Sequence, residues 1–126
     1  MPNLVESDVL IDISRGKQAA RNYVDALTGG WAISQISALE LIVGARDQRD
    51  LAAIDGFLSA FLIIPIRQST GKRAYDLLKR HAKADGLHVF DSLVAATAIE
   101  EGLTLVTKNY KHFRAIAGLQ LEIPTY

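Results

Sequence analysis

Residues 3–13, NLVESDVLIDI, decide the fold, because three acids interrupt an otherwise apolar run. The run begins like a buried strand and continues with the spacing of a helix. Burying a carboxylate without a partner costs several kcal/mol. Glu6, Asp8 and Asp12 therefore either all face water, or a positive charge lies at the end of this strand.

The composition favours one folded domain. The chain has 126 residues, of which 49% are hydrophobic, which is enough for a single core and excludes a disordered tail. We therefore expect one domain over residues 1–126. The absence of cysteine excludes disulfides, thiolate zinc sites and a cysteine nucleophile.

The sequence also bears on location and partners. No apolar run reaches the roughly 18 residues of a membrane span, and no secretion signal is recognisable, so we expect a cytoplasmic protein without a membrane partner. The net charge is zero, but residues 1–66 hold five Lys and Arg against eight Asp and Glu, and residues 67–126 hold nine against six. This weak asymmetry permits an anionic partner near the C-terminal half.

Strands and helices alternate along the chain. Ser34 is placed to cap the helix that follows it. Short apolar strands between helices predict a parallel sheet covered on both faces, which is a three-layer α/β/α fold. The predicted strands are 2–7, 31–34, 61–66, 103–107 and 119–124. The predicted helices are 8–16, 17–30, 35–46, about 48–60, 70–86 and 88–102, and residues 108–113 are predicted to form a turn.

Polar residues gather where the predicted strands end. In an open parallel sheet, ligands bind beyond the carboxyl ends of the strands. Glu6 and Asp8 end the first strand, and their spacing of two would aim both side chains the same way from an extended backbone. The other polar residues at this edge are Glu40 in the helix after the second strand, Asp91 in the first turn of helix 88–102, and Thr107 and Asn109 after the fourth strand.

This acidic cluster indicates a metal site. Carboxylates brought together raise one another's pKa unless a cation neutralises them, and no lysine or arginine lies within these apolar stretches. A hard divalent cation such as Mg²⁺ or Mn²⁺ takes oxygen ligands, and it can activate a water and clamp a phosphate oxygen. The pattern therefore favours metal-assisted phosphodiester hydrolysis.

Four stretches give the chain a family resemblance. In order, they are VESDVLIDISRG at 5–16, ISALELIVGA at 36–45, HVFDSLVAATAIEEG at 88–102 and LTLVTKNYKHFRAIAGLQL at 103–121. In this order and spacing the chain resembles the PIN-domain nucleases, and specifically the VapC-type toxins of toxin–antitoxin pairs. The four stretches together span nearly the whole chain.

The resemblance implies a three-layer fold around a parallel five-stranded sheet and a Mg²⁺- or Mn²⁺-dependent endoribonuclease. Its substrate would be tRNA, rRNA or mRNA, and it would form a homodimer that a VapB-type antitoxin holds silent. Glu6, Glu40 and Asp91 match the metal-binding acids of the family. Thr107 matches its hydroxyl residue after the fourth strand, and Asn109 matches the polar residue two positions on.

The sequence departs from the family pattern at two positions. Glu6 stands where the family normally has Asp, and its extra methylene moves the carboxylate by about one carbon–carbon bond, enough to lower the rate at a finely tuned site. His112 stands where relatives often have Asp or Glu. The roles of Asp8 and His112 stay open, as does an alternative function: a catalytically weakened PIN domain that binds RNA or an antitoxin.

Other interpretations compete with these assignments. A phosphoacceptor receiver domain needs an Asp at the end of the third strand, where this chain has Arg67 and no acid. Glu6 and Asp91 could serve only as favourable charges at helix N-termini, and Asn109 could be an ordinary turn residue. We expect Asp12 to face solvent or pair with Arg15. The basic residues of helix 70–86 are expected mainly to form a solvated face.

Overall fold

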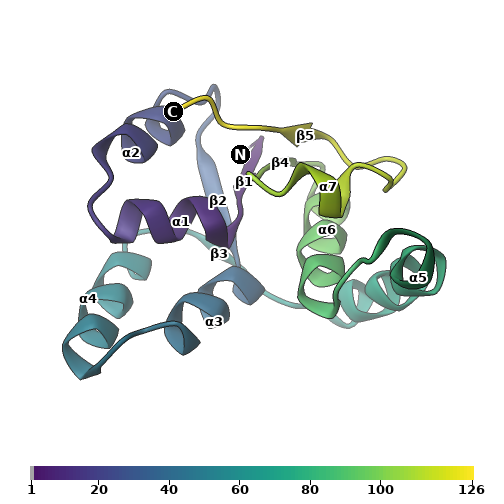
Figure 1. Cartoon of the computed structure of the whole chain (residues 1–126), viewed down its shortest axis with the longest axis horizontal. Coiled ribbons are helices and arrows are strands. Elements are labelled where there is room, and N and C mark those ends of the chain that lie inside the picture. The colour runs from purple at the N-terminus through teal and green to yellow at the C-terminus, as the bar shows by residue number, and fades with distance from the viewer. Residues whose placement is uncertain (1) are drawn as a thin grey trace.

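A five-stranded, all-parallel sheet lies at the centre of the protein, in a computed structural model that describes residues 2–126 (Figure 1). Its strand order is β3-β2-β1-β4-β5, so the first strand occupies the middle of the sheet. The predicted parallel sheet is therefore confirmed. The strands are β1 (Asn3–Val5), β2 (Trp31–Ser34), β3 (Ile63–Ile64), β4 (Thr104–Val106) and β5 (Leu121–Glu122).

Helices cover both faces of this sheet, with one group on each side of it in Figure 1. The first group comprises α1 (Ser7–Ser14), α2 (Gln18–Asp25), α3 (Gln35–Val43) and α4 (Gln48–Leu58). The second comprises α5 (Gln68–Asp85), α6 (Val89–Glu101) and α7 (Tyr110–Phe113). The arrangement confirms the three-layer α/β/α fold.

Successive strand residues supply the two halves of the core. Val5 and Val106 belong to the hydrophobic cluster beneath α1 to α4, whereas Leu4 and Leu105 belong to the cluster beneath α5 to α7. All four side chains are fully buried. Because neighbouring side chains of a strand point to opposite faces, both faces of the central strands must be apolar, as these sequences are. No helix among residues 2–126 is long and apolar enough to cross a membrane.

The elements differ from the sequence prediction at several ends. The predicted strand 61–66 is reduced to Ile63–Ile64, and it ends there because Pro65 has no N–H to continue the ladder of this edge strand. The predicted turn 108–113 contains the short helix α7. The predicted cap is confirmed, because the Ser34 hydroxyl accepts a hydrogen bond from the Ser37 backbone N–H at 3.1 Å.

Candidate active site at the carboxyl edge of the sheet

The junction of β1 and α1 holds the first acid of the site. Glu6 is the N-cap of α1 and is only 4% exposed. Its Oε1 accepts a hydrogen bond from the Ser7 hydroxyl at 2.8 Å, and its Oε2 accepts a longer one from the Asp8 backbone N–H at 3.4 Å. Glu6 therefore caps the helix and at the same time brings a carboxylate to the end of the central strand.

The segment after β4 joins Glu6 to Asp8. The buried Thr107 hydroxyl lies 3.3 Å from Glu6 Oε2 and 3.3 Å from Asp8 Oδ2, so two carboxylates share its one proton. The Lys108 backbone N–H donates to Asp8 Oδ2 at 2.9 Å, and the Asn109 N–H donates to the Thr107 hydroxyl at 3.0 Å. Loop 107–109 thus fixes both acids from the neighbouring strand.

Asp8 does not reach this place from an extended backbone. It lies in the first turn of α1, so the expectation that Glu6 and Asp8 share a direction along a strand was wrong. Both side chains nevertheless meet at Thr107, whose hydroxyl lies 3.3 Å from an oxygen of each. Burial and the charge of Glu6 raise the pKa of Asp8 to about 7.

Glu40 contributes a carboxylate from α3. Its Oε1 is buried, and no hydrogen-bond partner for it exists among residues 2–126. The Ser7 hydroxyl donates its one proton to Glu6 at 2.8 Å, although it also lies close enough to Glu40 to lower the pKa of that acid. Burial, the largest effect, raises the pKa of Glu40, and the charges of Asp91 and Asp8 raise it as well, so that the net shift is upward. A buried oxygen without a donor, facing other acids, is an environment that a cation would stabilise.

Asp91 enters from the opposite layer of the fold. It lies in the first turn of α6, and its side chain is 15% exposed. Oδ2 of Asp91 is 3.0 Å from Nδ1 of His112, which belongs to α7. The His112 ring packs edge-on against His88, with ring centroids 5.5 Å apart. Asp91 is therefore oriented by an imidazole, whereas Glu6 is oriented by hydroxyl and amide donors.

These groups line one open cleft with a volume of about 290 Å³. Of the residues predicted from sequence, Glu6, Glu40, Asp91 and Asn109 line it, and Thr107 is buried beside Glu6. As they stand in the structure, the His, Asp and Glu side chains of residues 2–126 include no group of three or more that could hold a metal ion. Sequence reasoning did not select four further lining residues, Ser7, Ile11, His88 and Phe90. For Ser7, His88 and Phe90, the available signal was their position next to Glu6 or within three residues of Asp91.

Asp12 lies outside the cleft, and its predicted partner was wrong. Asp12 Oδ2 accepts hydrogen bonds from the Lys108 ammonium at 2.7 Å and from the Tyr126 hydroxyl at 2.6 Å, not from Arg15. Burial opposes the effect, but these two donors lower the pKa of Asp12. A lysine thus lies beside the acidic cluster, although its ammonium is already paired with Asp12.

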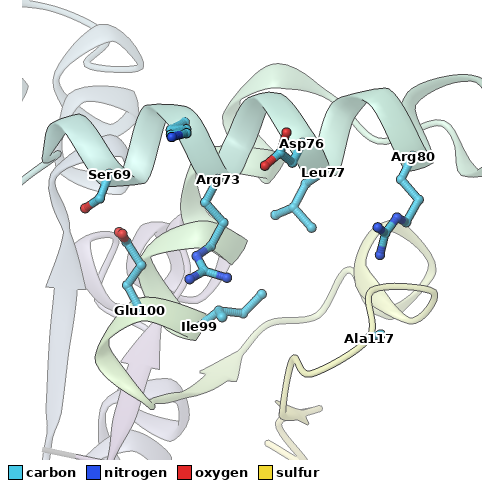
Figure 2. A pocket seen from close by; sticks show the side chains of 9 residues that line it. Ser69, Arg73, Asp76, Leu77, Arg80, Ile99, Glu100 and Ala117 are labelled. Atoms are coloured by element: carbon cyan, nitrogen blue, oxygen red, sulfur yellow. The ribbon is translucent and has the colours of Figure 1, made fainter.

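A larger hollow, of about 450 Å³, lies between α5, the C-terminal end of α6 and residue 117. Figure 2 shows Arg73 extending from α5 toward Ile99 and Glu100, and Arg80 extending toward Ala117. Glu100 accepts a hydrogen bond from the Thr70 hydroxyl at 2.6 Å. Acids and bases offset one another in this hollow, so it lacks the uncompensated carboxylates that mark the cleft.

Comparisons with known proteins agree with this architecture. The PIN domain family matches residues 4–119, and the chain therefore belongs to the PIN-domain family. Ribonuclease VapC10 of Mycobacterium tuberculosis is 36% identical over 115 residues, which cover 87% of this chain and 84% of that protein. Within the family, the chain is of the VapC type, as the sequence resemblance indicates.

Two solved structures are also similar. A toxin–antitoxin complex from Klebsiella pneumoniae contains a chain with 32% identity and a TM-score of 0.78, with coverage of 93% of this chain and 94% of that one. VapBC2 from Rickettsia felis, bound to a DNA fragment from its promoter, gives 27% identity and a TM-score of 0.82, with 98% of each chain covered. The parallel sheet and its helical layers are therefore those of the VapC fold.

Proposed function

We propose that this protein is a Mg²⁺- or Mn²⁺-dependent endoribonuclease that hydrolyses RNA phosphodiester bonds in the cleft. The observation that carries the proposal is the buried Glu40 Oε1, which has no hydrogen-bond partner among residues 2–126 and lies within the influence of the Asp8 and Asp91 charges. The ribonuclease name of a relative with 36% identity supports RNA as the substrate.

In this proposal Glu6, Glu40 and Asp91 are the residues that would hold the cation, since carboxylate oxygens are the ligands that Mg²⁺ and Mn²⁺ prefer. A bound divalent cation lowers the pKa of a water ligand and neutralises charge that develops on the phosphate. Thr107 holds the Glu6 carboxylate in place, and His112 does the same for Asp91. Asn109, which lines the cleft, is available to orient a phosphate oxygen or the attacking water.

We further propose that the protein is a toxin whose partner is a VapB-type antitoxin, and that it acts as a homodimer. The similar solved structures are toxin–antitoxin complexes, which supports a protein partner of this kind. The RNA would be a tRNA, rRNA or mRNA. Since the net charge is zero, general attraction to RNA is modest, and the shape of the RNA must contribute to its selection.

One observation favours a second candidate function. Both oxygens of Glu6 already accept hydrogen bonds within the chain, and Glu6 is longer than the Asp that the family normally has there. A cation would have to compete with these donors for the carboxylate. The alternative is therefore a weakened PIN domain that binds RNA or an antitoxin without efficient turnover.

Cleavage of labelled tRNA and rRNA by the purified protein, in Mg²⁺, Mn²⁺ or EDTA, tests both candidates. The Glu6→Asp and Asp91→Asn variants are assayed beside the wild type, with circular dichroism to verify their folding. We expect cation-dependent cutting by the wild type and a loss of at least about 100-fold in folded Asp91→Asn. Full activity of Asp91→Asn would refute the site, and cutting by Glu6→Asp alone would establish the weakened form.

A further inference from the structure

Phe90 differs from the other phenylalanines of the protein. The chain has four, and Phe57, Phe61 and Phe113 pack into one of the two hydrophobic clusters. Phe90 belongs to neither cluster, and its side chain is 58% exposed. Several large apolar residues are exposed among residues 2–126, and of these only Phe90 lines the cleft.

The start of α6 explains this position. Phe90 and Asp91 are consecutive residues in the first turn of α6, whose buried side begins at Ser92 and continues with Val94. Helical side chains lean toward the N-terminus of their helix, and the N-terminus of α6 lies at the cleft. The Phe90 ring thereby lines the same cleft as the Asp91 side chain.

The charges of the cleft restrict what can bind there. Glu6, Asp8, Glu40 and Asp91 all line it, and the nearby Lys108 ammonium is paired with Asp12. Attraction of phosphates, the usual main source of affinity for nucleic acids, is therefore weak at this surface. An RNA whose phosphate lies near Asp91 therefore needs contacts other than those to its phosphates. The bases of the two nucleotides that flank this phosphate are the nearest groups that could provide such contacts.

We propose that the Phe90 ring stacks on an unpaired nucleobase of the nucleotide adjoining the bond that is cut. This inference rests on the proposed ribonuclease function and makes Phe90 a residue that determines specificity. Proteins bind unpaired RNA bases by stacking them on exposed aromatic rings. His88, exposed beside Phe90, and Asn109 also line the cleft and offer hydrogen-bonding groups for the edge of such a base.

The test measures RNA binding in EDTA, so that it does not depend on cleavage. Short fluorescein-labelled oligo(A), oligo(U) and abasic RNA of equal length are titrated with protein, and the anisotropy gives Kd. We expect Phe90→Leu to weaken binding of oligo(A) about tenfold, and of oligo(U) somewhat less, with no change for abasic RNA. Phe90→Trp retains a ring and should restore the affinity.

Two control variants remove exposed apolar surface without touching the proposed contact. Val89→Ala alters the neighbouring residue, which is 59% exposed, and Tyr75→Leu removes a ring that is 63% exposed on α5. Both should bind all three RNAs with a Kd within about twofold of the wild type. The salt dependence of binding should be the same in every variant, because no phosphate contact is lost.

An unchanged Kd for oligo(A) in folded Phe90→Leu would overturn the proposal, and so would an equal loss for abasic RNA. Light scattering tests the rival occupant, a second copy of this chain. If Phe90→Leu and Val89→Ala both lower the molar mass and weaken all RNAs alike, then Phe90 serves self-association. Failure of the proposed function is a separate result, since it means that the wild type does not cut RNA in Mg²⁺ or Mn²⁺.

Discussion

Nδ1 of His112 lies 3.0 Å from Oδ2 of Asp91, although 21 residues separate them in sequence. The contact joins α7 to the first turn of α6, and it occupies one oxygen of a carboxylate that we propose as a ligand of the cation. The same imidazole packs against His88. His112 is thus the residue that sets the orientation of Asp91.

This contact predicts that loss of the N–H donor at position 112 lowers the rate of RNA cleavage. Replacing His112 with Phe keeps a ring against His88 but removes the donor, so we expect cleavage to fall about tenfold through misplacement of Asp91. His112→Asn keeps an N–H close to the position of Nδ1 and should retain most of the activity. Cleavage rates in Mg²⁺ decide the matter, and equal rates for the two variants would contradict a positioning role.

The unpartnered oxygen of Glu40 predicts an unusual stability effect. Glu40→Gln removes a half-buried charge close to other acids, so in EDTA we expect the free energy of unfolding to rise by up to about 1 kcal/mol and Tm by up to about 3–5 °C. Mg²⁺ or Mn²⁺ should raise the Tm of the wild type, and this increase should be lost in Glu40→Gln. Differential scanning fluorimetry measures both effects.

Glu100 provides the matched control for Glu40. Its carboxylate accepts a hydrogen bond from Thr70 at 2.6 Å, and although burial opposes the effect, donors on Ser69 and Thr70 and the charge of Arg73 lower its pKa. Glu100→Gln should therefore lower Tm and leave the cation-induced increase intact. A lower Tm for Glu40→Gln in EDTA, or an unchanged cation effect in that variant, would count against the assignment of Glu40.

The sequence predicted the layers of this fold because they depend on local patterns. An apolar run such as WAIS predicts a strand that is buried on both faces of the sheet. Ser34 can cap the following helix through its own hydroxyl, and this local contact does not depend on how the helix packs. The acids of the cleft were also predictable, since residues that follow parallel strands meet at one edge of the sheet.

Contacts between distant segments were not predictable in the same way. The pairing of Asp12 with Lys108 joins residues 96 apart, and nothing near Asp12 in sequence distinguishes Lys108 from Arg15 as its partner. Phe90 belongs to a mostly apolar helix, a pattern that favours burial, yet it lies in the first turn of that helix and is 58% exposed. Whether a residue near the end of a helix is buried or exposed depends on where that helix begins or ends. Sequence patterns locate these boundaries only to within one or two residues.

The C-terminal residues provide a prediction about stability and pH. The Tyr126 hydroxyl donates to Asp12 Oδ2 at 2.6 Å, and Asp12 in turn holds Lys108 of the loop that fixes Asp8. Tyr126→Phe should reduce the free energy of unfolding by about 1 kcal/mol at neutral pH. Urea denaturation measures this loss, and Tyr75→Phe, at a position 63% exposed, should change stability by less than about 0.5 kcal/mol.

The sign of the pH dependence follows from Asp12. Its pKa in the folded protein is lowered from the ordinary value of 3.8, so its contacts contribute stability above that pH and lose it as the pH falls. The difference between wild type and Tyr126→Phe should therefore shrink progressively below about pH 4. Parallel urea titrations across this range test the point, and a difference that stays constant down to full protonation would show that Tyr126 stabilises the protein by packing alone.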